Sequence, residues 1–349
     1  MSKCDLSIEL DRPDQLYKTG DTVSCTITVS VDKTVNCDGL TVTNLWQTHG
    51  KGNRDSATLT SEELFQGEWQ PGEYSYSFSF EIKEGPLTYR GHYINIDHYV
   101  KVRADIPWAI DPKTEIEYIV EKGSQPLESS LNTLKPSNLN QHYKQTKFIK
   151  KLETVINNPL RFVNYGIALS LIPLIIGGFL LYLFFFTDSG SGDPIFGFIL
   201  LAIGLFAAAK LIMIKILHGK IGHVIFEATP SSVRATDEID IKFEFTPNVD
   251  IDVNNITFNL IGKESATSGS GTNRRTVVHQ FHSTEQELHR KGIIMRDMPV
   301  MERARIQIPI DVPPSFSASN NRIKWAIQAK MDIDNSPDWN KEAPIEILI

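Results

Sequence analysis

The sequence predicts a mainly β protein in which two β-sandwiches are separated by a two-helix transmembrane hairpin. Three observations support this fold class. Two long apolar stretches lie in the middle of the chain, both flanks alternate apolar and polar residues as half-buried strands do, and the second flank repeats the pattern of the first. The predicted units are an N-terminal sandwich over 1–121, a polar to basic linker over 122–160, the hairpin over 161–218 and a C-terminal sandwich over 219–349.

The N-terminal flank consists of short alternating segments. In VSCTITVSV, residues 23–31, every second residue is apolar, which predicts a strand with one buried face. Further strands are predicted from Leu40 to Trp46, from Tyr74, from Tyr93 and over EIEYIV up to Val120. Turn signals at Asp38-Gly39 and Pro71-Gly72 separate the segments, and no helical period competes with them, so a β-sandwich is expected.

The two apolar stretches span residues 162–186 and 195–217. Each exceeds the roughly 20 residues that a helix needs to cross a hydrocarbon core. Because only the polar turn TDSGSGDP at 187–194 separates them, they predict a hairpin that crosses a membrane twice. Three residues of the first stretch suit either a kink and a helix–helix contact face or ordinary packing: Pro173, Gly177 and Gly178.

Charge predicts the orientation of the hairpin. Basic residues precede the first stretch and close the second: Lys144, Lys147, Lys150, Lys151, Arg161, Lys210, Lys215 and Lys220. The turn between the stretches contains Asp188 and Asp193 but no basic residue, so the positive-inside rule predicts that both flanking domains are cytoplasmic. Lys210 lies about two turns inside the second stretch, where we expect its side chain to snorkel to the interface and not to serve an ion pathway.

Composition excludes several functional classes. Cys4, Cys25 and Cys37 form no CxxC spacing, so we expect a reducing compartment and neither a disulfide framework nor a zinc site. The formal net charge is −7 and no basic stripe occurs, which argues against a nucleic-acid partner. The first apolar run begins only after about 160 residues, so no signal peptide is expected.

The C-terminal flank repeats the N-terminal flank in order. An offset of 216 residues places Val23 on Ile239. The offset then grows to 227, which places Asp105 on Asp332, and finally to 229, which places IEYIV on the terminal IEILI. Each copy also has a tryptophan between its last two strands: Trp108 and Trp339. A duplicated sandwich explains this ordered series better than generic strand alternation does.

Four segments of the N-terminal flank occur in a characteristic order: LYKTGDTVSCTITV from Leu16, CDGLTV from Cys37, GEWQPGEYSYSFSFEI from Gly67 and GPLTYRGHYINIDHYVKVRADIPW from Gly85. Together they resemble the N-domain of arrestin-like proteins, over about residues 5–120. The C-terminal unit, about residues 224–349, is similar to an arrestin C-domain mainly through ATPSSVRATDEIDIKFEF from Ala228. The resemblance implies two immunoglobulin-like, arrestin-type sandwiches and a role in binding other proteins.

Two features depart from the arrestin-like pattern. Members of that family join their sandwiches by a short linker, whereas this chain inserts about 40 linker residues and the apolar hairpin. It also lacks the paired N-terminal lysines of visual-type arrestins, having only Lys3. The resemblance therefore does not imply phosphate-dependent receptor recognition.

The chain contains none of the GxSxG, HExxH, Walker and GxGxxG motifs. His92 and His98 share a face if their strand is regular, with His49 in a loop, so a histidine metal site is conceivable, although solvated or hydrogen-bonded histidines are the expectation. The three histidines of the second flank are His279, His282 and His289. A three-residue step along a strand places the first two on opposite faces.

Paired carboxylates are expected at the surface: Glu62, Glu63, Glu285 and Glu287. We therefore predict no catalytic, cofactor-binding or metal-binding residue, no cofactor and no enzymatic activity. The sequence does not identify the partner-binding residues. The Gly/Ser-rich segment from Ser265 is expected to be a mobile hairpin tip, and its Arg274-Arg275 pair also suits anionic lipid or an acidic partner.

The predicted function is that of a membrane-tethered, non-enzymatic scaffold or adaptor whose cytoplasmic domains bind cytoplasmic segments of membrane-associated partner proteins. The alternative is a regulatory subunit of a membrane complex or transporter, assembled through the hairpin at a Gly177-Gly178 face. A third hypothesis, an enzyme or small-ligand site between the sandwiches, has no motif to support it.

Overall fold

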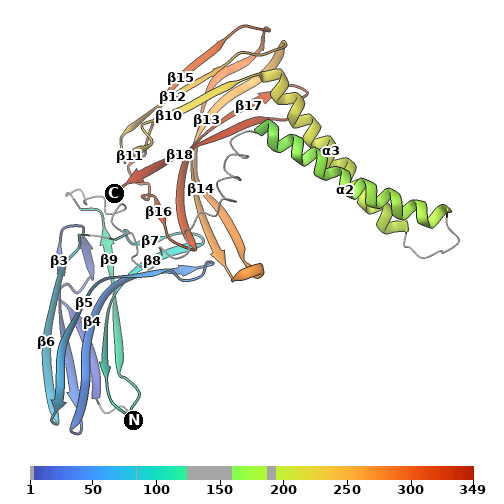
Figure 1. Cartoon of the computed structure of the whole chain (residues 1–349). Coiled ribbons are helices and arrows are strands. Elements are labelled where there is room, and N and C mark those ends of the chain that lie inside the picture. The colour runs from blue at the N-terminus through green and yellow to red at the C-terminus, as the bar shows by residue number, and fades with distance from the viewer. Residues whose placement is uncertain (1–3, 84, 124–158, 187–193) are drawn as a thin grey trace.

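The computed structural model describes residues 4–83, 85–123, 159–186 and 194–349 (Figure 1). The basic segment before the first apolar stretch, Lys3 and the acidic turn after Phe186 lie outside the described residues. Two β-sandwiches flank a pair of helices, so the predicted mainly β fold class is confirmed.

The N-terminal sandwich packs a three-stranded sheet against a larger sheet. The smaller sheet has the order β1 (Cys4–Leu10), β3 (Thr22–Val31) and β6 (Gly72–Glu81). The larger sheet has the order β2 (Leu16–Lys18), β9 (Lys113–Glu121), β8 (Ile94–Asp105), β4 (Val35–Gly50) and β5 (Ser56–Trp69), with β7 (Tyr89–Arg90) paired to β8. The predicted turn at Asp38-Gly39 is wrong, because β4 runs through it with an irregular register to β5.

The C-terminal sandwich repeats this topology strand for strand. Its smaller sheet has the order β10 (Val224–Thr229), β12 (Glu238–Phe245) and β15 (Val300–Gln307). Its larger sheet has the order β11 (Ser232–Arg234), β18 (Trp339–Leu348), β17 (Asn321–Ile333), β13 (Ile251–Ser268) and β14 (Arg275–Ile294), with β16 (Phe316–Ser317) paired to β17. In both sandwiches the short second strand pairs in parallel with the last strand.

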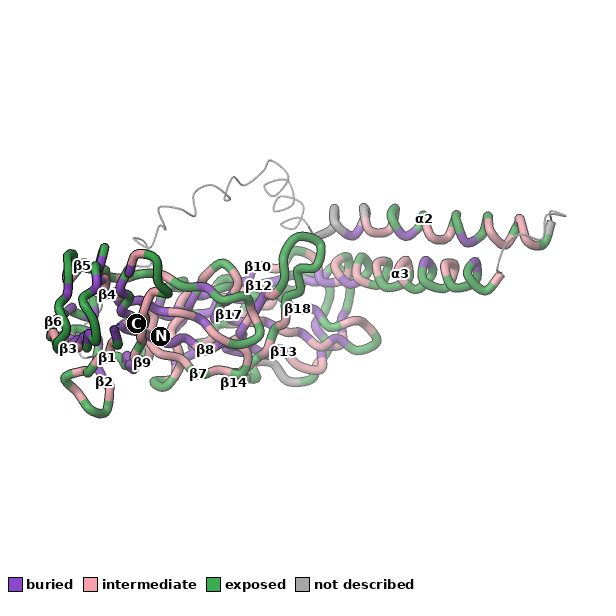
Figure 2. The backbone as a smooth tube through the Cα atoms, turned by 90° about the horizontal axis from the view of Figure 1, so that it is seen from below, coloured by how far each residue is buried: buried purple, intermediate pink, exposed green. Residues whose placement is uncertain are grey.

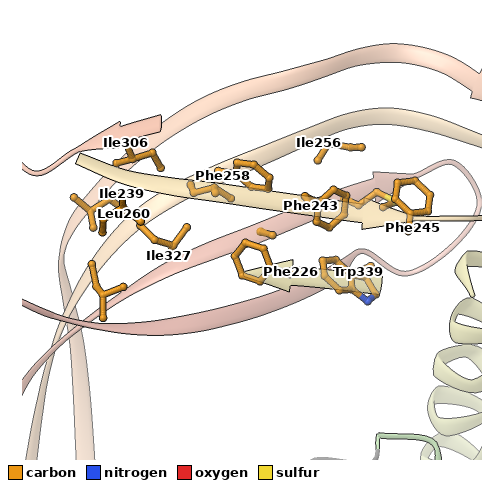
Figure 3. Packing of buried hydrophobic residues seen from close by; sticks show 14 of the residues in the cluster. Phe226, Ile239, Phe243, Phe245, Ile256, Phe258, Leu260, Ile306, Ile327 and Trp339 are labelled. Carbon is orange, nitrogen blue, oxygen red and sulfur yellow. The ribbon is translucent and has the colours of Figure 1, made fainter. Parts of the chain in front are cut away.

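Alternating side chains build the two cores as the pattern predicts. Val23, Ile27 and Val29 on β3 are fully buried, and the polar residues between them are exposed or half-buried. On β12 the equivalent residues Ile239 and Phe243 are also fully buried, in a core rich in phenylalanine (Figure 3). Burying such a side chain contributes about 1.5–3 kcal/mol, so each sandwich is stabilised mainly between its sheets.

Strand register tests the predicted offsets. Leu40 pairs with Ala104 and Ile256 pairs with Met331, so the offsets of 216 and 227 are confirmed together. The offset of 229 for the last strand is wrong, because Trp325, the counterpart of His98, pairs with Ile345 and not with Ile347. A shift of two residues preserves strand alternation, so the apolar pattern alone does not reveal it.

The two tryptophans are not counterparts, which corrects the sequence prediction. Trp339 begins β18, pairs with Met331 and is buried, whereas Trp108 lies in the connection between β8 and β9 and is fully exposed.

The two helices are α2 (Pro159–Phe186) and α3 (Pro194–Ile221), and both are long and apolar enough to cross a membrane. They lie side by side and extend away from the sandwiches, with many apolar side chains exposed (Figure 2). A Cβ on Gly177 would lie 2.8 Å from the carbonyl oxygen of Gly197, so Gly177 packs inside the pair, whereas Gly178 faces open space. Lys210 Nζ lies 5.1 Å from the centre of the Phe206 ring.

Helix α3 ends inside the C-terminal sandwich. Leu217 and Ile221 belong to that sandwich's hydrophobic core. The backbone N–H of Asn248 donates to the carbonyl of Lys220 at 2.8 Å, and its side-chain amide donates to the carbonyl of Gly219 at 2.8 Å. Gly222 ends the helix with φ 75°, a conformation that favours glycine, and β10 begins two residues later. The helix and the sandwich therefore form one packed unit.

Candidate interaction site

A buried carboxylate from the C-terminal sandwich holds the N-terminal sandwich. Glu264 on β13 has no exposed surface. Its Oε1 accepts hydrogen bonds from the Tyr89 hydroxyl at 2.6 Å and the His92 backbone N–H at 3.0 Å, and its Oε2 accepts from the Tyr93 N–H at 2.6 Å. Burial, and then the bond to Glu264, raises the pKa of the Tyr89 hydroxyl, which therefore stays protonated and donates.

A second carboxylate, from the N-terminal sandwich, accepts hydrogen bonds from the C-terminal sandwich. Asp55, in the connection between β4 and β5, accepts the backbone N–H groups of Asn320 at 2.9 Å and Asn321 at 3.0 Å. Both asparagine side-chain amides also donate to Asp55, at 2.9 and 2.8 Å, and that of Asn321 donates to Thr48 Oγ1 at 2.9 Å.

The two contacts are related by the internal repeat. The offset of 227 places Tyr93 on Asn320, so the segments that the two carboxylates hold are equivalent in the repeat. The carboxylates themselves are not equivalent, because the offset of 216 places Thr48 and not Asp55 on Glu264. Only the held segments therefore follow the pattern of a two-fold interface. We call the hydrogen-bonded contacts of Glu264 and of Asp55 the two clasps. Hydrogen bonds to charged groups contribute about 1.5–3 kcal/mol each, and a buried carboxylate without partners is strongly unfavourable. The clasps therefore favour one relative arrangement of the sandwiches.

Apolar side chains from both sandwiches complete the interface. Trp46 packs edge-on against Phe316, with ring centres 5.5 Å apart. Ile94 and Ile96 of the N-terminal sandwich and Ile323 of the C-terminal sandwich belong to the same buried cluster.

A groove of about 420 Å³ lies between the sandwiches. Its walls include segment 85–89 from the N-terminal sandwich and segment 312–316 from the C-terminal sandwich, which are equivalent at the offset of 227. Lys122 and Arg234 also line it. A mostly apolar groove with a few polar groups is the usual form of a binding site for a peptide or small ligand.

Equivalent hydrogen bonds hold both wall segments in place. His98 Nε2 donates to the carbonyl of Pro86 at 2.9 Å, and Trp325 Nε1 donates to the carbonyl of Pro313 at 3.0 Å. Because a carbonyl only accepts, the imidazole of His98 carries its proton on Nε2. Burial lowers the pKa of His98 to about 4, so the ring is neutral near neutral pH.

The histidines considered in the sequence analysis do not form a single cluster. His98 is buried in the N-terminal sandwich against Tyr118, whereas His92 precedes β8, so the shared face considered for them is wrong. The His92 ring instead packs on His279, with ring centres 4.2 Å apart across the interface.

His49 lies 3.5 Å from the Asp97 carboxylate and His282 packs on Trp325. The backbone of His289 pairs with Ile256. Among the described residues, no three His, Cys, Asp or Glu side chains are grouped so as to hold a metal ion.

The paired carboxylates lie on edge strands. Glu62 and Glu63 on β5 and Glu285 and Glu287 on β14 are exposed, as predicted. All three cysteines are buried, and burial raises the pKa of Cys25 to about 11, so this thiol is unreactive near neutral pH.

Sequence reasoning missed the clasp carboxylates. Glu264 lies between Gly262 and Ala266 in a strand where most buried positions are apolar, and a charged residue at such a position was the available signal. Asp55 had no comparable signal, because its partners are 265 and 266 residues away along the chain.

No family model and no curated protein match this chain. Among solved structures, the chain is similar to the crystal structure of Spo0M, a sporulation control protein from Bacillus subtilis, with 11% sequence identity, 99% of this chain and 91% of that chain covered, and a TM-score of 0.30. A TM-score this low carries no argument about function.

Proposed function

We propose that the protein is a membrane-tethered, non-enzymatic adaptor whose two sandwiches lie in the cytoplasm and bind a cytoplasmic segment of a partner protein. The observation that carries this proposal is the groove formed by equivalent segments of both sandwiches, in a body that is packed directly onto an apolar helix pair. The resemblance of the N-terminal motifs to arrestin-like proteins also supports a role in protein binding.

The groove suits an extended, mainly apolar segment. Pro86 and Pro313 lie in its two walls, and hydrogen bonds of Glu264 and Asp55 join the two sandwiches that form these walls. A preformed site loses little conformational entropy when it binds. Tethering to the membrane raises the effective concentration of membrane partners, so a weak contact at the groove is sufficient.

Cytoplasmic orientation rests on charge. Lys215 and Lys220 lie near the end of α3 that joins the C-terminal sandwich, and α2 begins at this same end of the pair (Figure 1). In the sequence, the predicted basic residues precede that start of α2. Lys220 Nζ donates to Ser336 Oγ at 3.1 Å, so this charge lies beside the sandwich. Basic residues at this end favour retention on the cytoplasmic side.

Orientation is tested with single-cysteine variants. The native cysteines are buried, so an impermeant thiol reagent reports the introduced residue alone. In intact cells we expect labelling of Ser189→Cys and no labelling of Ser270→Cys until the membrane is opened. Labelling of Ser270→Cys in closed cells would place the sandwiches outside and contradict the proposal.

Partner binding is tested with a photo-crosslinking residue at Leu87 in the groove, and with the same residue at exposed Glu73 as the control. We expect partner-specific crosslinks at Leu87. The substitution Phe316→Ala, which changes the groove lining without changing its charge, should reduce these crosslinks. Equal crosslinking at both positions would remove the groove from the proposal.

A regulatory subunit assembled through the helices is the second candidate. Among the described residues, no other part of the chain comes within 4 Å of a Cβ placed on Gly178, and the neighbouring Phe179 is 58% exposed, so this face of α2 is open to another helix. Crosslinks from Phe179, with none from Leu87, would favour this candidate over the adaptor.

A further inference from the structure

Two loop tips from different sandwiches join to form one surface. The backbone N–H of Asn53 donates to the carbonyl of Thr267 at 2.8 Å. Its side chain donates to the carbonyl of Gly269 at 2.9 Å and accepts from the Gly269 N–H at 3.1 Å. We call residues 50–54 and 268–275 together the tip surface.

The tip surface is basic. Its four charged residues are all cationic and exposed: Lys51, Arg54, Arg274 and Arg275. Within the described part of the chain, no ion pair involves any of these four residues. The nearest acidic residue in sequence, Asp55, is buried and saturated by the amides of Asn320 and Asn321. Four positive charges are therefore left facing solvent.

The placement of this surface relates it to the helices. Figure 1 shows the free end of hairpin β13–β14 pointing downward from the C-terminal sandwich, with the end of β4 beside it, and the helices α2 and α3 leaving the same side of that sandwich toward the lower right. Because α3 is packed into the sandwich core through Leu217 and Ile221, this placement is a property of a single packed unit. A membrane crossed by the helices would face the tip surface.

We propose that the tip surface binds the anionic headgroups of the bilayer that α2 and α3 enter, as a second attachment that sets the tilt of the sandwiches. This inference rests on the proposed membrane insertion of the helix pair. Anionic lipid is preferred to an acidic protein because the helices bring the bilayer to this side of the molecule permanently. Exposed Lys and Arg side chains also contact headgroups without needing a shaped pocket.

The expected strength follows from the charge. Each Lys or Arg near an anionic surface increases binding about fivefold, so the four residues together contribute roughly 100- to 1,000-fold at low salt. This attraction weakens as the Debye length falls to about 8 Å at physiological ionic strength and about 3 Å at 1 M.

The test uses the full chain in nanodiscs. A fluorophore on Thr272→Cys reports the tip surface, and one on exposed Glu73→Cys is the position control. Quenchers on lipid headgroups are compared in phosphatidylcholine discs and in discs that also contain phosphatidylserine. We expect strong quenching at position 272 only in the anionic discs, reversed by 1 M salt.

Charge variants identify the residues responsible. Replacing Lys51, Arg54, Arg274 and Arg275 by Gln should abolish the quenching. Replacing four other exposed basic residues by Gln should leave it unchanged: Lys33, Lys113, Arg303 and Lys341. Equal loss in both quadruple variants would overturn the proposal, because net charge and not the tip surface would then be the cause.

Further outcomes separate the possible failures. An unquenched tip in anionic discs overturns the proposal, and binding of polyglutamate that depends on the same four residues would assign the tip to an acidic protein partner instead. A fluorophore on Phe179→Cys reports insertion through quenchers on the acyl chains. Absence of quenching at position 179 would refute membrane insertion itself, and the lipid proposal with it.

Discussion

The N-terminal and C-terminal sandwiches make the same hydrogen bonds with different side chains. His98 holds the carbonyl of Pro86 in the first, and Trp325 holds the carbonyl of Pro313 in the second. A second pair of hydrogen bonds is also repeated. The backbone N–H of Thr88 donates to the carbonyl of Val120, and the Val120 N–H donates to the Thr88 hydroxyl. Ser315 and Ile347 make the same two bonds in the C-terminal sandwich. The duplicated feature is thus a pattern of bonded backbone groups, and the residue that supplies each donor has changed.

The two sandwiches also differ in which member of one cross-strand residue pair is the large side chain. Trp46 on β4 pairs with His98, whereas Gly262 on β13 pairs with Trp325. A Cβ on Gly262 would lie 2.9 Å from the Trp325 ring and 2.7 Å from Phe281. Each pair therefore contains one tryptophan, on opposite strands in the two sandwiches, because a close-packed position keeps its total volume while its members change.

The sandwiches differ most where α3 enters. Leu217 and Ile221 complete the C-terminal core, and no helix residue in the described part of the chain enters the N-terminal core. The second copy therefore includes the end of α3 in its core, while the first is packed from its own strands.

The largest difference is expected for Ile221→Ala. Removing this fully buried side chain should destabilise the C-terminal sandwich by about 2–5 kcal/mol, because it leaves a cavity in the core. Hydrogen exchange measured by mass spectrometry on peptides from each sandwich checks this. Ile216→Ala, at a half-exposed position of the same helix, is the control. Equal protection loss in both sandwiches would show that they unfold together.

The next largest difference is expected in the pH dependence of stability, because His98 can bind a proton and Trp325, at the equivalent position, cannot. The pKa of His98 is lowered to about 4 in the folded protein, so the unfolded chain binds a proton first as the pH falls. Stability of the N-terminal sandwich should decline from about pH 6.5 to pH 4, by about 3 kcal/mol in total. Urea unfolding across this range measures it. His98→Gln should remove this part of the decline, and a decline of unchanged size would assign it to other groups.

The two clasps are expected to be unequal. Glu264→Gln should weaken the interface by about 1–3 kcal/mol, because an amide accepts at one atom only and its NH₂ group faces donors. Asp55→Asn should have the smaller effect, since Asp55 is 9% exposed and Glu264 is fully buried. Exchange at the amides of residues 92–93 and 320–321 reports each clasp separately. An equal effect of both substitutions on both turns would mean that the clasps open as one.

The smallest effect is expected for the wall bonds. Thr88→Ala and Ser315→Ala each remove one side-chain hydrogen bond at the groove and should destabilise their own sandwich by about 0.5–1.5 kcal/mol. Thermal unfolding with Thr88→Ser, which keeps the hydroxyl, provides the control. A loss in the serine variant as large as in the alanine variant would assign the effect to the methyl group.

Periodicity predicted the interior of the fold because it depends on neighbours along the chain. The buried face of β3, its repeat on β12 and the two apolar helices were all visible in this way. The register of β18 was not, since a two-residue slip leaves the same faces buried. The contacts of Glu264 and Asp55 join distant parts of the chain, so no local pattern encodes them.

The end of α3 also determines how far the helix can slide. Its 28 residues rise about 42 Å, and a hydrocarbon core of about 30 Å accommodates roughly 20 of them, so in the proposed membrane-spanning arrangement the last turn would lie beyond the core. A piston movement of α3 into the bilayer would draw Ile221 out of the sandwich core, and the opposite movement would push Asn248 off the helix end. If α3 crosses a membrane as proposed, the C-terminal sandwich would therefore limit how far this helix moves along its own axis in either direction.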